Sequence, residues 1–287
     1  HSIYRAESWT NSTPTTPVNI LDIKGGLNDV VMNNSPIDID KLIEGTNEIL
    51  TANRNSLQLF DMLHSMRQFD DLTYVHSVNV ALIASIIGQW LKFSEKDIRI
   101  LTISGLLHDI GKIMIPNEIL TKPGKLTVAE YNIMKQHVNF GYEKLKNQNI
   151  DIRIKEACLL HHEKCDGTGY PFGLKSDHIP AVAKIIAIAD VYDAMTSARV
   201  YRGALCPFEV IDTMYKDAFT KFEPKYILPF LKNVASSYIN NDVRLSDGRI
   251  GKVVLINENA LSLPIIQCED EFIDLSKTRG LTVSAIL

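Results

Sequence analysis

The sequence predicts a mainly α-helical fold with a small β-rich appendage at its C-terminal end. From residue 38 to about residue 230, apolar residues recur at helical spacing almost without interruption. Helix-start signals punctuate this part of the chain, and after about residue 240 short apolar runs separated by turn residues take over. We therefore divide the chain into an N-terminal segment (residues 1–37), a helical domain (38–239) and a β-rich appendage (240–287).

The first part of the chain gives the weakest signals. Residues 1–36 are rich in Ser, Thr, Asn and Pro, and they suggest only a short extended segment at residues 18–23. Helical spacing begins in residues 38–66 and continues in residues 74–91.

Capping signals then define two helix starts. Ser94, with an acid three residues later, is an N-cap for a helix that carries His108 near its end and stops around Gly111. Thr127, again with an acid three residues later, forms a capping box and opens a helix that carries His137.

Four further helices and a set of strands complete the prediction. The helices are expected at residues 151–163, 181–197, 207–219 and 224–237, with a loop rich in Gly and Pro after the first of them. A hairpin-like Asp-Gly turn lies within residues 243–250, and short strands are expected at residues 253–256, 264–268 and 272–275.

Composition limits the classes of function. The chain has 287 residues, of which 45% are hydrophobic and 22% charged, as in an ordinary folded globule. A net charge of -4 argues against binding of polymeric nucleic acid, although a small phosphate ligand needs only a local cluster of cations.

The sequence also predicts a cytoplasmic protein that does not enter a membrane. The longest apolar stretch, residues 78–91, contains polar residues and is too short to cross a bilayer, and the polar N-terminus resembles no signal peptide. Four widely spaced cysteines form no CxxC pair, which argues against a disulfide framework or a thiolate metal site.

A pair of adjacent candidate metal ligands, His108 and Asp109, follows an apolar helix and precedes Lys112. An isolated pair of this kind is usually two solvated residues. The chain also carries further imidazoles and a carboxylate in separate helical segments, namely His76, His137, His161, His162 and Asp190. Neutral imidazoles and carboxylates suit divalent first-row metals.

Each of these residues has another reading when taken alone. Asp190 lies in a very apolar helix, where a buried carboxylate must find a partner, which is either a metal or a salt bridge or hydrogen bond. His161 and His162 point about 100° apart on a helix and can share a metal only at a helix end or bend. His76 and His137 could be ordinary core or surface histidines.

Together the seven residues favour a dinuclear site in which Asp109 bridges ions about 3.5–4 Å apart. We leave His1, His64 and His178 outside this site.

Several motifs accompany these ligands, namely the HHE triplet at residues 161–163, the DGTGYP block at 166–171, the ADVYDAMTS block at 189–197 and the RVYR run at 199–202. Together with the ligands, these motifs resemble the HD-GYP family. These proteins are cyclic di-GMP phosphodiesterases within the HD metal-dependent phosphohydrolase superfamily, and the resemblance covers about residues 66–232. It implies an HD-type helical bundle around a metal centre. One ion would be held by His76, His108, Asp109 and Asp190, and the other by Asp109, His137, His161 and His162.

The sequence departs from some members of the family at one position. Those members hold a third metal with a glutamate four residues before the first histidine, where this chain has Leu72. We therefore expect two divalent metal ions rather than three. The resemblance favours iron or manganese, while the ligand types leave zinc, cobalt and nickel open.

The resemblance also implies a reaction. Cyclic di-GMP would be opened to the linear dinucleotide pGpG, with a further step to GMP left open, by a hydroxide that bridges the two metals. Asp109 and Lys112 are the expected catalytic residues.

The expected substrate contacts are Lys112, Tyr170, Arg199 and Arg202. An ammonium and two guanidinium groups suit phosphate oxygens, and Tyr170 would lie at the mouth of the site. The plain alternatives are a solvated lysine at a helix end, a surface arginine pair and a tyrosine that packs a loop.

Two other functions stay open at this stage. One is hydrolysis of a different cyclic dinucleotide or nucleotide phosphoester. The other is a non-catalytic sensor or scaffold that binds the dinucleotide, which should have lost metal ligands or Lys112, whereas this chain retains them. A homodimer is also compatible with the sequence, and the β-rich appendage could mediate dimerisation, bind a partner or cap the helical bundle.

Overall fold

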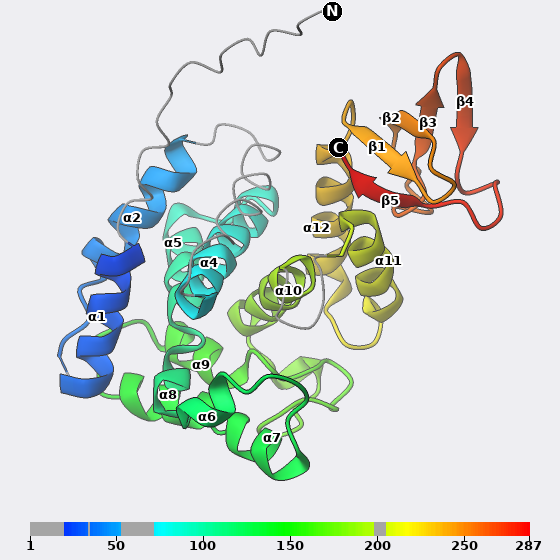
Figure 1. Ribbon diagram of the computed structural model, residues 1–287. Helices are drawn as coiled ribbons and strands as arrows, with labels where there is room; N and C mark the ends of the chain where they lie inside the picture. Colours follow the sequence, from blue (N-terminus) through cyan, green and yellow to red (C-terminus); the bar gives the residue numbers. More distant parts are fainter. Residues whose placement is uncertain (1–19, 34, 53–71, 198–204) are drawn as a thin grey trace, which may run out of the picture.

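The computed structural model describes residues 20–33, 35–52, 72–197 and 205–287. Within these ranges, a bundle of helices lies beside a five-stranded antiparallel sheet formed by the C-terminal part of the chain (Figure 1). The predicted fold class, mainly α with a small C-terminal β part, is confirmed.

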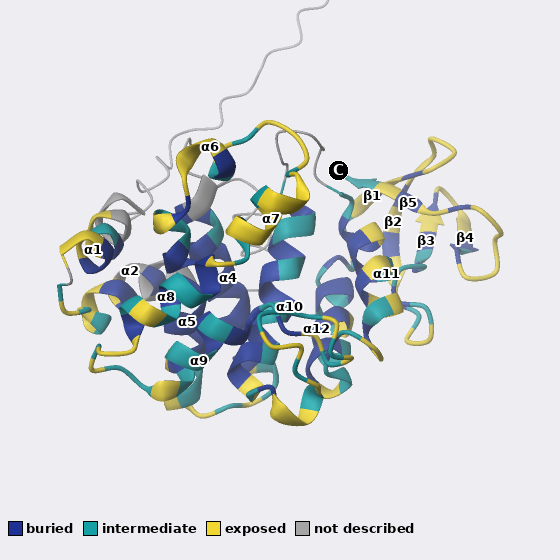
Figure 2. Ribbon diagram, turned by 90° about the horizontal axis from the view of Figure 1, so that it is seen from below, coloured by how far each residue is buried: buried dark blue, intermediate teal, exposed yellow. Residues whose placement is uncertain are grey.

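The centre of the bundle is α4 (Leu72–Trp90), an apolar helix with buried side chains on all sides. Such a helix is expected in the interior of a domain rather than on its surface. It packs against α5 (Glu95–Leu107) and α10 (Ala181–Thr196), and Figure 2 shows the buried residues concentrated in these central helices.

Two helices near the start of the described chain, α1 (Ile20–Asn33) and α2 (Ile39–Ala52), cover one side of α4. The expectation of an extended segment at residues 18–23 is wrong for its described part, because α1 begins at Ile20. The apolar residues Leu27, Val30 and Val31 recur at helical spacing and are buried, so burial of this stripe favours a helix.

The helices that follow begin where the sequence predicts. Asp97 donates its backbone N–H to the Ser94 hydroxyl at 3.2 Å at the start of α5, and Thr127 and Glu130 form a reciprocal capping box at the start of α7 (Val128–Met134). Between them lie the 3₁₀ helix η2 (Ile110–Met114) and α6 (Asn117–Leu120). The expectation that the helix opened by Thr127 carries His137 is wrong, because α7 ends at Met134 and His137 begins the next helix.

The remaining helical elements surround the same interior. They are α8 (His137–Leu145), α9 (Ile152–Leu160), the 3₁₀ helix η3 (Ser176–His178), α11 (Pro207–Asp217) and α12 (Pro224–Ser237). The predicted helices at residues 151–163, 181–197, 207–219 and 224–237 are therefore present with slightly different ends.

The sheet has the strand order β4-β3-β2-β1-β5. Its strands are β1 (Asp242–Leu245), β2 (Ile250–Leu255), β3 (Ile265–Cys268), β4 (Glu271–Asp274) and β5 (Val283–Ile286). The Asp-Gly turn joins β1 to β2 as predicted, and α11 packs beside β5. The sequence did not predict β5, which is short and has a single buried residue, Val283.

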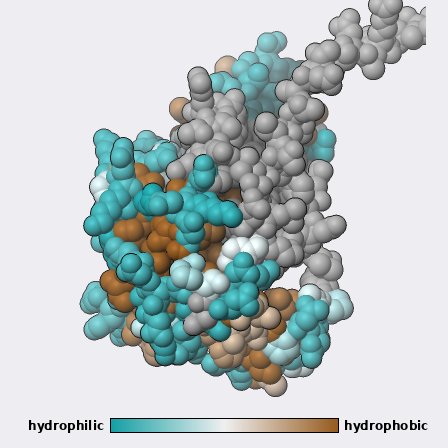
Figure 3. Space-filling model, turned by 90° about the vertical axis from the view of Figure 1, so that its left-hand side faces the viewer, coloured by the Kyte–Doolittle hydropathy of each residue, from teal (hydrophilic) through white to brown (hydrophobic). Residues whose placement is uncertain are grey.

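The surface mixes polar and apolar residues. On the side of the molecule that carries α1, apolar residues gather in an area bordered by hydrophilic ones (Figure 3). Exposed apolar residues are common on folded proteins and do not by themselves mark a site. Among the described residues, no helix combines the length and the apolar character that a bilayer span requires.

Candidate metal centre

The seven predicted ligands come together from separate elements in the interior of the bundle. His76 lies on α4, Asp190 on α10, and His137 is the first residue of α8. The remaining four lie just past helix ends, His108 and Asp109 after α5 and His161 and His162 after α9. Since a helix end lets neighbouring side chains turn toward one point, both doublets can present both members to one site.

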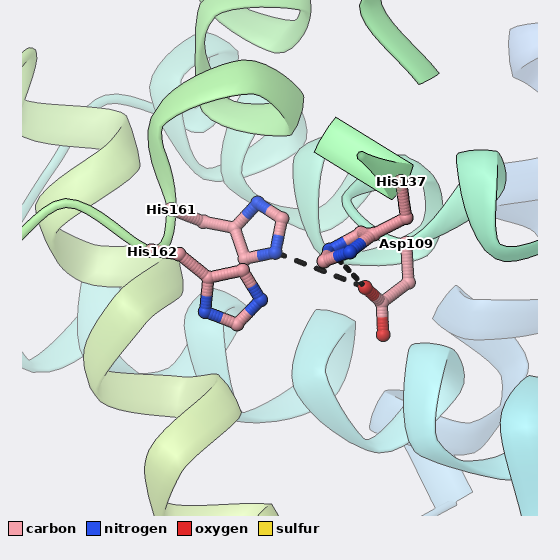
Figure 4. A group of neighbouring side chains, drawn as sticks. All are labelled: Asp109, His137, His161 and His162. Carbon is pink, nitrogen blue, oxygen red and sulfur yellow. Dashed lines mark ion pairs between the residues drawn. The ribbon is translucent and has the colours of Figure 1, made fainter. Parts of the chain in front are cut away.

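The donor atoms form two groups. Asp109, His137, His161 and His162 make up the first, which Figure 4 shows, and His76, His108 and Asp190 make up the second. Within each group, one donor atom from every residue lies within 4.8 Å of the others. This division matches the two ligand sets that the resemblance implies, apart from the shared Asp109.

Asp109 faces both groups, each with a different oxygen. Its Oδ1 lies 3.3 Å from His137 Nε2 and 3.8 Å from His161 Nε2. Its Oδ2 lies 3.3 Å from His108 Nε2 and 3.6 Å from His76 Nε2. A carboxylate in this position can bridge two cations.

Backbone carbonyls orient three of the imidazole rings. The Nδ1 atoms of His108 and His137 each lie 2.7 Å from a carbonyl oxygen, of Gly105 and Met134 respectively. His161 Nδ1 lies 3.0 Å from the Cys158 carbonyl. Carbonyls only accept, so each Nδ1 carries the proton, and in a neutral ring Nε2 is left with a free lone pair.

Those lone pairs point into the centre without a partner. The Nε2 atoms of His108, His137 and His161, and Oδ1 of Asp109, are buried and make no hydrogen bond among the described residues. Each of these Nε2 atoms lies 3.3–3.8 Å from a carboxylate oxygen of Asp109, but none of these contacts has the geometry of a hydrogen bond. Because leaving several buried acceptors unsatisfied is costly, this donor set fits bound metal ions.

His76 is held by a carboxylate that the sequence did not single out. Its Nδ1 lies 2.7 Å from Oδ2 of Asp193, whose other oxygen accepts a hydrogen bond from Asn79 Nδ2 at 2.9 Å. The opposite nitrogen, Nε2, lies 3.1 Å from Asp190 Oδ1. Burial opposes protonation of His76, but the carboxylates of Asp190 and Asp193 outweigh it and raise its pKa to about 10.

Asp193 therefore orients His76 in the way that outer carboxylates orient metal-bound histidines. Its sequence signal was its spacing. Asp193 follows Asp190 by three residues, so both carboxylates lie on the same buried face of α10.

The protonation states of the other groups suit cation binding. Burial lowers the pKa of His162 to about 4 and that of His161 well below its usual value, so both rings are neutral at pH 7. Burial would raise the pKa of Asp109, but the Lys112 ammonium and His108 hold it well below its usual value. His161 and His162 thus offer neutral imidazoles beside the ionised carboxylate of Asp109, which are the forms that bind metals, whereas His76 would have to give up a proton to bind one.

Lys112 and Gly111 shape the edge of the centre. The Lys112 ammonium forms an ion pair with Oδ2 of Asp109 and is half-buried. Gly111 lets η2 lie directly against α8, because a Cβ at this position would lie 2.0 Å from the His137 carbonyl oxygen. A glycine at residue 111 therefore allows Asp109 and His137 to approach each other.

The loop after His162 folds back over the doublet. Asp166 accepts hydrogen bonds from the backbone N–H of Thr168 at 2.9 Å and from its hydroxyl at 2.7 Å, so it organises the loop. Glu163, whose role was not predicted, is buried. Its carboxylate accepts hydrogen bonds from the backbone N–H groups of Phe172 at 2.7 Å and Leu174 at 2.9 Å.

The same loop places Tyr170 against the centre. A Cβ on Gly169 would lie 2.4 Å from the Lys164 backbone nitrogen, so only glycine allows the loop to pass this close to the end of α9. The ring of Tyr170 stacks on His162, with ring centroids 4.7 Å apart and an interplanar angle of 25°.

Other predicted residues lie elsewhere. Arg199 and Arg202 are outside the described residues, as are His1 and His64. His178 lies in η3 and belongs to neither donor group.

Comparison with known proteins identifies the family. The profile of the HD domain family matches residues 43–226. "Cyclic di-GMP phosphodiesterase PA4108" of Pseudomonas aeruginosa is 36% identical over 203 residues, which are 70% of this chain and 49% of that protein. "3'3'-cGAMP-specific phosphodiesterase 2" of Vibrio cholerae is 32% identical over 193 residues, 66% of this chain and 37% of that protein. The chain thus spans about half or less of the length of these curated relatives.

A solved structure shows the same fold. It is that of Bd1817, described as an HDG"Y"P protein from Bdellovibrio bacteriovorus, and it aligns with a TM-score of 0.55 and 18% sequence identity over 76% of this chain and 73% of that one. At this identity the likeness supports the fold only. Together with the profile match over more than half of the sequence, it confirms the resemblance seen in the motifs, and the chain belongs to the HD domain family.

Proposed function

We propose that this chain is a metal-dependent phosphodiesterase that opens cyclic di-GMP to the linear dinucleotide pGpG. One observation carries the proposal. Buried imidazole nitrogens and a carboxylate oxygen, which have no hydrogen-bond partner within the described ranges, converge from separate elements on one point. The relatives whose names state cyclic dinucleotide phosphodiesterase activity support the substrate class.

The donor groups suggest how two ions would be held. We assign His76, His108, Asp109 and Asp190 to one ion and Asp109, His137, His161 and His162 to the other. Leu72 offers no carboxylate one turn before His76, which favours two ions over three. All donors are nitrogen or oxygen, in keeping with iron or manganese.

Bound divalent ions would supply a nucleophilic water at neutral pH and offset charge on the phosphoryl oxygens. The protein's own residues would position the ester. The Lys112 ammonium, beside Asp109, places a positive charge where a phosphate oxygen could bind. Tyr170 closes one side of the centre by stacking on His162.

Arg199 and Arg202 keep their proposed role as phosphate contacts on the strength of their sequence pattern alone. Hydrolysis of pGpG to GMP is a further step that the same centre could perform, since pGpG still contains one phosphodiester bond.

The test is turnover by the purified chain reconstituted with Mn²⁺ or, without oxygen, Fe²⁺. Cyclic di-GMP should be consumed with formation of pGpG, identified by chromatography and mass spectrometry. The double variant His108→Ala, Asp109→Ala should lose activity by at least a thousandfold. Turnover that survives in the double variant would show that the centre is misassigned.

A second substrate has specific support, because a relative is named for the hybrid dinucleotide 3'3'-cGAMP. Parallel assays with this compound decide between the two by kcat/KM. If neither is hydrolysed by metal-loaded protein although both bind, the chain is a sensor rather than an enzyme.

A further inference from the structure

A lysine outside the predicted site lies at its rim. Lys135 follows α7, and its ammonium lies 5.3 Å from the ring centroid of Tyr131, one helical turn earlier. The same ammonium lies 5.9 Å from the ring centroid of Tyr170, which belongs to the loop after α9. Lys135 therefore contacts aromatic rings from two different elements.

One of the two rings that Lys135 contacts, Tyr170, lies directly against the candidate metal centre. Tyr170 stacks on His162, so a single ring separates the Lys135 ammonium from a candidate metal ligand. Tyrosine is uncharged at neutral pH. The ring offers Lys135 its face and no counter-ion.

The charge of Lys135 is not neutralised by a carboxylate in the described part of the chain. Lys112, Lys122 and Lys184 are half-buried too, but they pair with Asp109, Glu130 and Glu223. Lys144 and Lys155 resemble Lys135 in forming no such pair within the described residues, so the place of Lys135 beside Tyr170 is what distinguishes it. Lys135 is half-buried as well, and the reduced exposure strengthens its attraction for an anion.

We propose that Lys135 binds the phosphate of the cyclic dinucleotide that is not being hydrolysed, so that the site selects ligands with two phosphates. This inference rests on the proposed function. A cyclic dinucleotide carries its two phosphates on opposite sides of the macrocycle, and the metal centre with Lys112 can serve only one of them. A compact ammonium at the rim, held by two rings, supplies a cation for the second.

The plain alternative is that Lys135 only fastens α7 to the loop that carries Tyr170. The two roles predict different kinetics. A fastening role affects every substrate equally, whereas a contact to the second phosphate affects only ligands that have one.

The experiment compares Lys135→Met with wild type on cyclic di-GMP and on bis(p-nitrophenyl) phosphate, a diester with a single phosphate. The ratio of kcat/KM for cyclic di-GMP to that for the small diester should fall about tenfold or more, mainly through KM. Lys135→Arg, which keeps the charge, should recover most of this ratio.

Lys96→Met is the matched control. Lys96 is exposed near the start of α5, about 18 Å along the helix from His108. Its removal deletes the same charge and should change the ratio less than twofold. An equal loss on both substrates in Lys135→Met, or an unchanged ratio, overturns the proposal.

A binding measurement separates this proposal from the proposed function. Fluorescent 2'-O-methylanthraniloyl cyclic di-GMP is titrated into wild type and Lys135→Met in the presence of a chelator. Absent turnover by the wild type defeats the proposed function, yet a tenfold weaker Kd in the variant still supports Lys135 as a phosphate contact. Equal Kd values refute the contact whether or not the wild type is active.

Discussion

Among single residues, the candidate ligands could be predicted from the sequence, whereas the residues that orient them through hydrogen bonds could not. Histidines and acids in a distinctive pattern identified all seven candidate ligands. Asp193 and Asn79 escaped notice because their role depends on α4 meeting α10, and His76 and Asp193 are 117 positions apart. Glu163 likewise acts through backbone N–H groups that only the folded loop brings to it.

The support given by Asp193 has a measurable consequence. Asp193→Asn keeps the size of the side chain but removes the charge beside His76 Nδ1. We expect metal affinity to fall by about 10–100-fold, as for other outer partners of metal-bound histidines. Metal content after dialysis against graded chelator measures this. Asp212→Asn, an acid on α11 that pairs with Lys216, serves as control, and equal metal retention in both variants would contradict the expected role.

At the scale of elements, the helix ends decide where the ligands lie. The N-caps Ser94 and Thr127 allowed the starts of their helices to be predicted from the sequence, because capping is a local interaction. The helix at residues 20–33 and strand β5 were not foreseen, since burial against distant elements stabilises them. The close contact of η2 with α8 was also invisible, because it depends on the absence of one side chain at Gly111.

Gly111→Ala tests that contact. The added methyl group would overlap the His137 carbonyl, so η2 and α8 must separate at a cost of about 1–3 kcal/mol in the free energy of unfolding. Denaturant unfolding measures the loss, and metal content should fall with it. Gly25→Ala in α1, where a Cβ meets nothing within 4 Å, should be neutral or slightly stabilising. Equal stability of the two variants would contradict the packing argument.

The capping box of α7 predicts a pH dependence. Hydrogen bonds from Lys122 and Thr127 lower the pKa of Glu130 from 4.5 to about 2. A depressed folded-state pKa means that the ionised carboxylate stabilises α7 above pH 4.5 and that this contribution is lost as the pH falls toward 2.

Glu130→Gln should therefore speed hydrogen exchange of the α7 amides relative to wild type at pH 7. The difference should shrink as the pH falls from 4.5 toward 3. A difference that is independent of pH would show that the charge of Glu130 does not matter to the helix.

For the whole molecule, the spacing of apolar residues predicted the helical bundle and the change to strands, because helical and strand periodicities are both visible in short stretches of sequence. It could not predict that α11 packs beside β5, since nothing local specifies which surfaces meet. The bundle brings several buried donors together, and ions bound there would stabilise the folded state. At a metal concentration 100 times Kd, the gain is about 2.7 kcal/mol, so adding chelator should lower Tm and restoring metal should recover it.

We propose that Asp109 serves two ions at once, because its two oxygens face different donor groups. The most direct measurement is the metal stoichiometry of wild type and Asp109→Ala, by plasma mass spectrometry on protein purified without oxygen. We expect about two ions per chain in the wild type and loss of both in the variant. Two ions retained by Asp109→Ala, or none bound by the wild type under metal excess, would contradict it.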